Sequence, residues 1–361
     1  MSNFFLVGGA VRDLLMQIPP SDRDYVVVGS TIDEMLAQGF TQVGSSFPVF
    51  LHPTTNEEYA LARTERKTGI GYNGFDTRFD PSITLEEDLK RRDLTINSMA
   101  MTANGTLVDP YGGFSDLKAG ILRHTSEAFS EDPLRVLRLA RFAAKFNFQV
   151  APETIELAKK IIAAGELNSL PRERLWTELY KGLECTHPKK MIDVLLEVGA
   201  AQVLPLSSYV GKSQLRRDVR SSPDVNAILM LGSIIELSTD EVAELKIPSK
   251  IVDAVRFEHH LTRAYAKTSE HQLNATELLD LMKKIHYGSK SPALTLALEA
   301  FAFRCHLENR LDRHQRFVNH LNAATAAIAK IDFETLTKNV EKRNLCEFIE
   351  GIKLNAIKSL T

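Results

Sequence analysis

The 361-residue chain is 44% hydrophobic and 25% charged, and its net charge of −2 at pH 7 excludes binding of nucleic acid or membranes through a global basic excess. The N-terminus lacks a signal-peptide pattern, no apolar run approaches the roughly 18 residues that a membrane helix needs, and the three cysteines have no zinc-type spacing. We therefore expect a cytoplasmic protein of two or three domains, with no membrane partner and no obligate protein partner.

Short strands and helices alternate in the first 120 residues. Strands are predicted where short runs rich in β-branched and aromatic residues are bounded by Gly, Pro or Asn, and helices where apolar residues recur every three to four positions. The strand segments are "FFLV", "DYVVV", "TQVG", "VFLH", "EYALAR" and "GTLVDP", and the helical segments are "AVRDLLM" and "TIDEMLAQ". This mixture predicts an α+β head over residues 1–120, with a mixed β-sheet and flanking helices.

Beyond about residue 120 the strand signals fade and helical periodicity takes over. The clearest helical segments are "PLRVLRLARFAAKF", "PETIELAKKIIAAG", "PRERLWTELYKGLE", "PKKMIDVLLEVGA" and two long helices within residues 291–330. We assign residues 121–205 to an all-α neck and residues 206–361 to an all-α body and tail, in which we find no chemical motif.

A glycine pair and two aspartates stand close together near the N-terminus. Gly8 and Gly9 end the first strand and precede a helix, whose free N–H groups and dipole suit an anion. Asp22 and Asp24 flank Arg23 at the start of the next strand, where side chains two residues apart share a face. Two adjacent carboxylates repel each other unless a cation lies between them, and Mg²⁺ shared with substrate phosphates is the natural cation.

The helix after the glycine pair contributes a further cation. Val11, Leu14 and Leu15 form its expected buried stripe, which places Arg12 off the core side, where it could reach a phosphate. Each of these motifs is weak alone, and the alternative for the aspartate pair is an ordinary solvated turn. Together they fit a metal-bound nucleoside triphosphate.

Four sequence blocks, in this order, resemble the tRNA nucleotidyltransferases that add CCA, together with the related bacterial poly(A) polymerases. The blocks are "LVGGAVRD" with "DRD", "RRDLTINSMA" at 91–100, "EDPLRVLRLARF" at 131–142 and "PRERLWTEL" at 171–179. The segments "DRDYVVVGST" and "EYALARTERKTGIGYNGF" look closer to the bacterial class II CCA-adding branch than to the poly(A) polymerases. The resemblance implies template-independent addition of CCA to the tRNA 3′ acceptor end from CTP and ATP. Asp22 and Asp24 would then be the catalytic ligands of two Mg²⁺ ions.

The resemblance also implies how the nucleotide is recognised. Arg92 would hold the triphosphate, and Asp93 would accept a hydrogen bond from the ribose 2′-hydroxyl. Asp132 and Arg135 would read the base, because a carboxylate and a guanidinium match the amino group and ring nitrogen that cytosine and adenine share. Uracil and guanine present a carbonyl and a ring N–H at those places, so the same pair would reject them.

Arg135, Arg138 and Arg141 occupy one arc of their predicted helix. Three arginines with almost no interleaved acid suggest an anionic partner, and we assign all three to nucleotide binding. The alternative is the charged face of an ordinary amphipathic helix.

Some features stay open. "GIGYNG" at 69–74 matches a dinucleotide motif, but no apolar helix follows it, so we expect a mobile loop, which in the family helps to switch from C to A addition. Glu57 or Glu58 could add a third carboxylate to the metal site, although a plain strand-end glutamate is the better interpretation. The chain has no His-Asp dipeptide, so we expect no phosphohydrolase domain built around such a pair.

Two other functions remain compatible with the sequence. One is a poly(A) polymerase, or a partial enzyme that adds only CC or only A, with the same chemistry. The other is an RNA-binding protein with a retired catalytic head, against which the intact aspartate pair argues.

Overall fold

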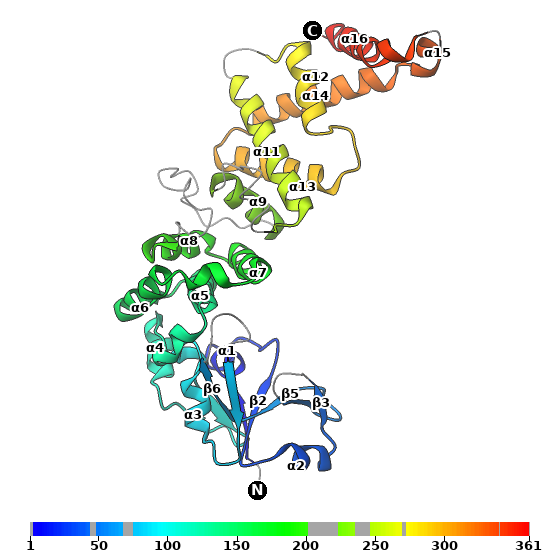
Figure 1. The fold of residues 1–361 in the computed structure, drawn as a ribbon. Coiled ribbons are helices and arrows are strands. Elements are labelled where there is room, and N and C mark those ends of the chain that lie inside the picture. The colour runs from blue at the N-terminus through cyan, green and yellow to red at the C-terminus, as the bar shows by residue number, and fades with distance from the viewer. Residues whose placement is uncertain are drawn as a thin grey trace. The chain divides into compact units, whose positions relative to one another are not determined.

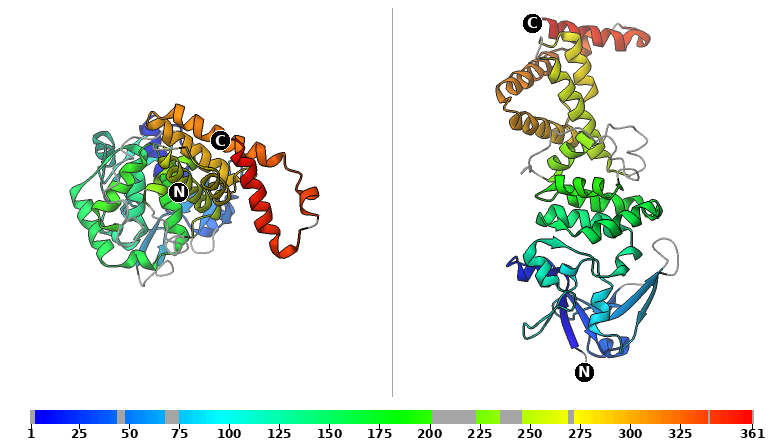
Figure 2. Two further views of the ribbon diagram at one scale, coloured as in Figure 1. Left: turned by 90° about the horizontal axis from the view of Figure 1, so that it is seen from above. Right: turned by 90° about the vertical axis from the view of Figure 1, so that its left-hand side faces the viewer.

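The computed structural model describes residues 3–43, 48–67, 75–200, 223–234, 246–268, 272–338 and 340–360. Contacts divide the chain into two compact units, Met1–Leu206 and Ser207–Thr361, and each is described by itself (Figure 1, Figure 2). The segment "GIGYNG", which we expected to be a mobile loop, lies outside the described residues.

A seven-stranded mixed sheet is the centre of the first unit (Figure 1). Its strands are β1 (Asn3–Val7), β2 (Asp24–Val28), β3 (Thr41–Val43), β4 (Val49–Leu51), β5 (Glu58–Leu61), β8 (Ala100–Thr102) and β9 (Leu107–Val108). Their order is β3-β4-β5-β2-β1-β8-β9, in which β2 and β5 run parallel and the other neighbours antiparallel. The six predicted strands and the mixed sheet are confirmed, whereas β8 was missed.

Two small sheets complete the strands of this unit. One pairs β6 (Arg63–Lys67) with β7 (Phe75–Phe79) in antiparallel register, and the other pairs β10 (Ile121–Leu122) with β11 (Gln149–Val150) in parallel register. None of these four strands was predicted, because the β6 segment "RTERK" is polar and the last pair is only two residues long.

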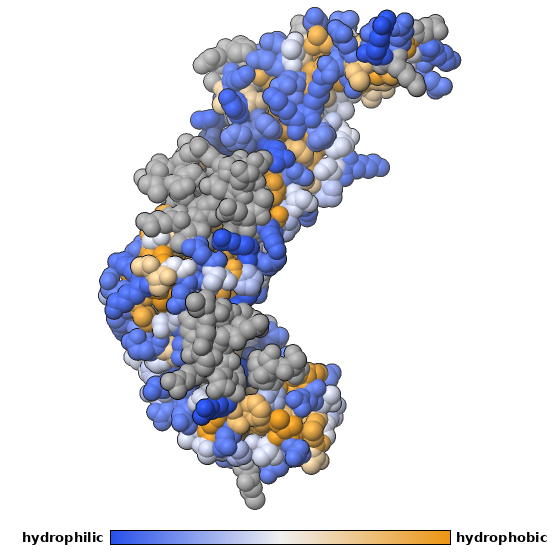
Figure 3. Space-filling model, viewed as in Figure 1, coloured by the Kyte–Doolittle hydropathy of each residue, from blue (hydrophilic) through white to orange (hydrophobic). Residues whose placement is uncertain are grey.

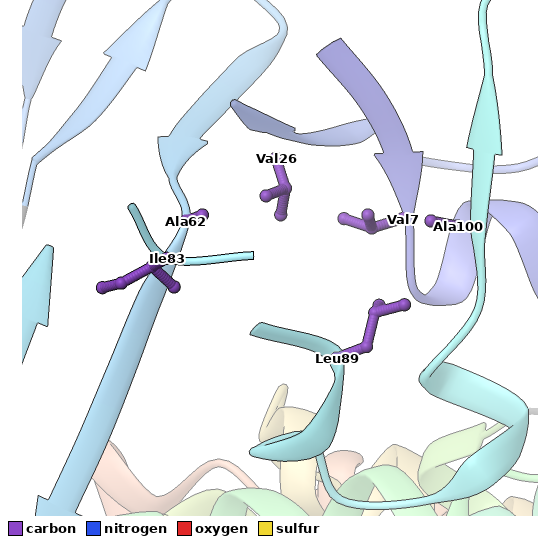
Figure 4. Close-up of a cluster of buried hydrophobic side chains, with 6 residues drawn as sticks. All are labelled: Val7, Val26, Ala62, Ile83, Leu89 and Ala100. Carbon is purple, nitrogen blue, oxygen red and sulfur yellow. The ribbon is translucent and has the colours of Figure 1, made fainter. Parts of the chain in front are cut away.

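Alternation along β2 divides the core of the head between the two faces of the sheet. One cluster contains Val7, Val26, Ala62, Ile83, Leu89 and Ala100 (Figure 4). The other face packs Val27, Met35, Phe40, Phe50 and Leu61. Because side chains two residues apart share a face, Asp24 lies on the face of Val26, toward the segment that carries Leu89.

Short helices flank the sheet. They are α1 (Gly9–Leu15), α2 (Ile32–Ala37), α3 (Leu85–Lys90) and α4 (Gly113–Ala119), with 3₁₀ turns η1 (Thr95–Asn97) and η2 (Glu127–Glu131). The starts of α2 and α3 are fixed by capping boxes, in which Thr31 pairs with Glu34 and Thr84 with Glu87.

Helices form most of residues 121–205, as the sequence predicts, although the short strands β10 and β11 also lie in this region expected to be all-α. The helices are α5 (Leu134–Phe146), α6 (Pro152–Ala163), the 3₁₀ turn η3 (Glu166–Ser169), α7 (Arg172–Leu183) and α8 (Pro188–Glu197). The apolar stripe of α5 packs against α7 and α8, so α5 is buried along most of its length.

The described part of the second unit is helical. Its helices are α9 (Pro223–Ile234), α11 (Ser249–Lys267), α12 (Ala275–Lys284), α13 (Pro292–Leu307), α14 (Leu311–Ala329), α15 (Phe333–Thr337), η6 (Lys342–Asn344) and α16 (Leu345–Lys358). The two long helices predicted within 291–330 are confirmed as α13 and α14. Among the described residues of the whole chain, no helix is both long enough and apolar enough to cross a membrane.

Candidate active site

The turn between β1 and α1 is shaped by two glycines that leave room for arginines. Gly8 has a φ of 69°, which an L side chain rarely adopts, and its N–H donates to the Met99 carbonyl at 3.1 Å. A Cβ on Gly8 would lie 2.9 Å from Nη1 of Arg92, and one on Gly9 would lie 3.4 Å from Nη2 of Arg12. The glycine pair therefore permits two guanidinium groups to lie against the backbone.

The aspartate pair lies at the mouth of β2. The strand begins at Asp24, so Asp22 lies before the strand and not on it, where we expected it to be. The charge of Asp22 still acts on Asp24. Burial raises the pKa of Asp24, the Asp22 charge raises it further, and the nearby Arg92 opposes both effects. A cation bound between the two carboxylates would relieve this repulsion.

Two glutamates lie beside the aspartate pair at the start of β5. Glu58 is in register with Asp24 across the parallel β2–β5 pair, so the two side chains share a face of the sheet. Glu57 instead lies 3.8 Å from Nη1 of Arg23 and accepts from Thr55 Oγ1 at 2.9 Å. Glu58 is therefore the better placed of the two to join a metal site.

The pair of aspartates suits Mg²⁺ better than it suits a metal ion that is bound entirely by protein side chains. No group of three or more His, Cys, Asp or Glu side chains forms a metal site within the part of the chain that the structure describes. Mg²⁺ characteristically takes one or two protein carboxylates and completes its coordination shell with substrate phosphates and water. Asp22 and Asp24 are such a pair.

Arg92 faces this site from the end of α3. Its Nη2 donates to Asp88 Oδ2 at 3.1 Å, and Asp88 is fully buried and also accepts from Arg91 Nη2 at 2.8 Å. Arg92 Nε is buried without a hydrogen-bond partner, unlike every other buried side-chain polar atom of the described residues. Nη1 of the same guanidinium lies against the Gly8 turn, and a guanidinium in that place suits a phosphate oxygen.

The sequence-based placement of Arg12 is wrong. Arg12 is only 4% exposed, whereas Leu14, expected in the buried stripe, is 38% exposed. The Arg12 guanidinium donates to Asp13 Oδ1 at 2.7 and 2.9 Å and to Asn97 Oδ1 at 2.5 Å, and lies 4.7 Å from the Phe146 ring centroid. Arg12 therefore links α1 to the loop of the second motif and to α5, and nothing in this geometry directs it at a phosphate.

Asp93 is the most strongly held carboxylate of the site. Its Oδ2 accepts from Nε and Nη2 of Arg138 at 2.9 and 2.6 Å, and its Oδ1 accepts from the Leu94 N–H at 2.8 Å and from Asn97 Nδ2 at 3.0 Å. Burial alone would raise the pKa of Asp93, but the Arg138 charge and these hydrogen bonds lower it to about 2. Asp93 is therefore ionised and oriented before any ligand binds.

This pKa shift predicts a pH-dependent contribution to stability. The pKa falls from 3.8 to about 2 on folding, so the stabilisation is complete above the unfolded value and is lost as the pH drops from about 4 to about 2. A shift of this size corresponds to about 2 kcal/mol. We expect the wild type to lose about that much more unfolding free energy over this range than Asp93→Asn, as measured by urea unfolding. Equal losses in the two proteins would contradict the proposed ionisation.

Asp132 and Arg135 lie together at the start of α5. Asp132 Oδ1 accepts from the Leu134 N–H at 3.0 Å, and its Oδ2 lies 3.4 Å from Nη2 of Arg174. The Arg135 guanidinium donates to the carbonyls of Ala128 at 2.9 Å and Arg91 at 2.7 Å. The two residues are joined through the backbone, where the Arg135 N–H donates to the Asp132 carbonyl at 3.0 Å, and the Arg135 side chain links α5 to Arg91 of the second motif.

Two of the α5 arginines have acidic partners within the protein, although α5 itself contains no acid. Arg138 pairs with Asp93, and Arg141 Nε donates to Oε2 of the buried Glu178 at 2.6 Å. The Arg141 guanidinium also lies 4.4 Å from the Phe142 ring centroid. The acids come from distant elements and not from α5, so both arginines have an intramolecular anion in this structure.

The opposite face of the sheet carries a separate hollow. A cavity of about 740 Å³ is lined by Phe4, Leu6, Tyr25, Phe40, His52, Tyr59 and Met101, among others. Tyr25 follows Asp24 on β2 and points to the other face, and Figure 3 shows hydrophobic side chains gathered over the region of β3, β5 and α2. This cavity therefore lies behind the aspartate pair and does not belong to the candidate site.

Sequence reasoning missed three buried polar residues of the site. They are Asp88, Asn97 and Glu178, each of which holds an arginine named above. The available signal for Asn97 was its position four residues after Asp93 within "RRDLTIN". For the other two, only their burial in the fold distinguishes them from solvated helix acids.

Family models match both parts of the first unit. Residues 4–123 match the poly A polymerase head domain, and residues 147–208 match a model described as "Probable RNA and SrmB- binding site of polymerase A". The first unit is therefore similar to the head domain and the RNA-binding region of poly(A) polymerases.

Curated proteins named Multifunctional CCA protein resemble part of the chain. A protein of Chromobacterium violaceum named Multifunctional CCA protein is 62% identical over 202 residues, which are 56% of this chain and 50% of that protein. A protein of the same name from Nitrosococcus oceani is 56% identical over 236 residues, which are 65% of this chain and 57% of that protein. The chain spans about half the length of the curated relatives it matches.

Solved structures of CCA-adding enzymes have a similar fold. The Bacillus stearothermophilus CCA-adding enzyme in complex with CTP matches with a TM-score of 0.69 and 24% identity, over 99% of this chain and 89% of that chain. The Thermotoga maritima CCA-adding enzyme complexed with tRNA matches with a TM-score of 0.67 and 21% identity, over 100% and 88%. The chain therefore shares the fold of these enzymes, an α+β head followed by helices.

Proposed function

We propose that the chain adds CCA to the 3′ acceptor end of tRNA, without a template, from CTP and ATP. The observation that carries this proposal is the arrangement at the β1–α1 turn. There the Arg92 guanidinium lies against Gly8 and its charge acts on the carboxylate of Asp24, which is in register with Val7 just before the turn. A nucleoside triphosphate bound with a divalent cation would satisfy the arginine and neutralise the carboxylates together.

Asp22 and Asp24 would hold Mg²⁺ in this proposal. The bound ion would lower the pKa of the attacking 3′-hydroxyl and neutralise charge on the phosphates. The chain's own groups bind and orient the substrates. The backbone of Gly8 and Gly9 and the guanidinium of Arg92 hold the triphosphate, and pyrophosphate leaves from the same cradle.

The nucleoside is recognised by the loop of the second motif and the start of α5. Asp93 accepts from the ribose 2′-hydroxyl, and Asp132 and Arg135 contact the pairing edge of cytosine or adenine. Arg138 acts through its ion pair with Asp93, and Arg141 through its pair with Glu178. We assign these last two and Arg12 a supporting place around the nucleotide, since each is held by the protein itself.

The rest of the chain follows from the same proposal. Residues 1–120 form the catalytic head and residues 121–205 the neck that presents α5. Residues 206–361 form a helical body and tail that binds tRNA. The protein acts in the cytoplasm, where its nucleotide and tRNA substrates occur.

The test uses purified protein and a tRNA transcript that ends at the discriminator base. With CTP alone we expect two added nucleotides, with ATP alone none, and with both three, as sized on a gel. The Asp24→Ala variant serves as the inactive control. Addition of UTP or GTP as readily as CTP, or no addition by the wild type, would contradict the proposal.

A further inference from the structure

A buried chain of hydrogen bonds joins α1 to α5 through a single amide. Arg12 Nη1 donates to Asn97 Oδ1 at 2.5 Å, and Asn97 Nδ2 donates to Asp93 Oδ1 at 3.0 Å. Arg138 then donates to the other oxygen of Asp93. Asn97 is 6% exposed and Asp93 7%, so water does not compete for these contacts.

The two ends of the Asn97 side chain meet opposite charges. Its carbonyl oxygen accepts from a cation, and its amino group donates to an anion, which is a pairing that only an amide can make in this orientation. A carboxylate at this position would lose the donor and place a second negative charge beside Asp93. A hydrocarbon would leave a buried guanidinium N–H and a buried carboxylate oxygen unpaired.

The Arg12 end of the chain is fixed independently. The guanidinium is also bound by Asp13 and lies over the rings of Phe142 at 5.4 Å and Phe146 at 4.7 Å. Arg12 therefore holds the Asn97 side chain in one orientation relative to α5.

The acceptor capacity of Asp93 is filled in this structure. A carboxylate offers about four acceptor positions, and the four donors are Arg138 Nε, Arg138 Nη2, the Leu94 N–H and Asn97 Nδ2. A ribose hydroxyl must therefore replace one of them. The Arg138 side chain is 35% exposed and uses two N–H groups on one oxygen, so it is the donor that can yield. Asn97 and the Leu94 N–H are enclosed and keep hold of Oδ1.

We propose that Asn97 is a positioning residue for ribose selection: it keeps Oδ1 of Asp93 turned inward, so that Oδ2 faces the 2′-hydroxyl when Arg138 yields. This inference rests on the proposed function, in which Asp93 reads the ribose. Asn97 itself does not touch the nucleotide. Its loss should therefore weaken discrimination between ribonucleotides and deoxyribonucleotides more than it weakens triphosphate binding.

The test compares CTP with 2′-deoxy-CTP in two assays, tRNA extension and equilibrium binding without tRNA. For Asn97→Asp, which has nearly the same shape, we expect the ratio of kcat/KM for CTP over 2′-deoxy-CTP to fall about tenfold, as expected for one hydrogen bond to a charged group. The same change is expected in the ratio of binding constants. Asn97→Ser, a smaller uncharged variant, should lower the ratio in the same direction and guards against a folding defect of the aspartate variant.

Ser98→Ala is the matched control. Ser98 is the next buried residue of the same loop, and its hydroxyl bonds to the Leu94 carbonyl and to Thr125 without contacting Asp93. It should lower stability and leave the ratio unchanged. An unchanged ratio in both folded Asn97 variants, with a discriminating wild type, would overturn the inference alone. A wild type that binds or incorporates neither nucleotide would instead overturn the proposed function.

Discussion

Asp24→Ala and Asp22→Ala are each expected to lower the rate of nucleotide incorporation at least about a thousandfold, because a metal at the reacting phosphate stabilises the transition state by several kcal/mol. The structure supports this expectation through the raised pKa of Asp24, to which the Asp22 charge contributes. The measurement is the single-turnover rate of CTP addition to a tRNA that lacks its CCA end, at saturating Mg²⁺.

The control for these variants is Asp33→Ala. Asp33 is an exposed carboxylate in the first turn of α2. Its substitution removes one negative charge, as the site variants do, but leaves the mouth of β2 intact. We expect its rate to stay within about twofold of the wild type, as for a surface substitution. Near-normal turnover in both site variants would refute the assignment of the aspartate pair.

Substitution of Asp132 is expected to change which base is added. Asp132 Oδ1 caps the first turn of α5 through the Leu134 N–H, and Oδ2 is directed to Arg174. Asp132→Ala removes both oxygens, and with them a cap worth about 1 kcal/mol. Asp132→Asn can keep the capping oxygen and replaces the second oxygen with an amino group, which repels the cytosine amino group and suits the uracil carbonyl.

The matched pair therefore separates stability from selectivity. We expect both variants to lower the ratio of kcat/KM for CTP over UTP by about tenfold or more, since one mismatched polar contact at a buried edge costs roughly 1–3 kcal/mol. Only the alanine variant should also lower the thermal midpoint. An unchanged CTP-to-UTP ratio in Asp132→Asn would show that another group reads the base.

Much of the fold could be predicted because its signals are local. The six predicted strands consist of short apolar or alternating runs, and the helices around α5 carry clear apolar stripes. Strands β6 and β7 were not predicted, because both contain charged residues and each is held in place by pairing with the other. The short strand β8 has only three residues, of which Thr102 alone is β-branched, and it is held by pairing with β1 and β9.

Some residues of the site could likewise be predicted from short sequence motifs, whereas others depend on distant parts of the chain. The glycine pair and the aspartate pair are visible as short motifs, because the turn and the start of β2 need those residue types in sequence. The partners of the arginines are not visible, since Arg138 and Asp93 are 45 residues apart and Arg141 and Glu178 are 37 apart. A helical wheel shows which residues share an arc but not which element covers that arc.

Arg12 illustrates the limit most clearly. The seven-residue helix α1 is too short for its own apolar stripe to decide its orientation. The side that carries Arg12 is covered by η1 and by the aromatic rings of α5, neither of which is adjacent in sequence. Arg12 can be buried there because its guanidinium is paired with the amide of Asn97 and the carboxylate of Asp13.

We propose that this chain completes the tRNA 3′ end and does not synthesise tails on any RNA. A net charge of −2 gives little non-specific attraction to phosphates, whereas a helical body can present one shape to one acceptor. The most direct measurement offers a tRNA ending at the discriminator base and an unstructured oligonucleotide, each with ATP alone and with CTP plus ATP, at moderate salt. We predict that the tRNA gains three nucleotides with both substrates and then stops, and that the oligonucleotide is not extended. Long adenylate tails on the oligonucleotide with ATP alone would contradict the account and identify a poly(A) polymerase.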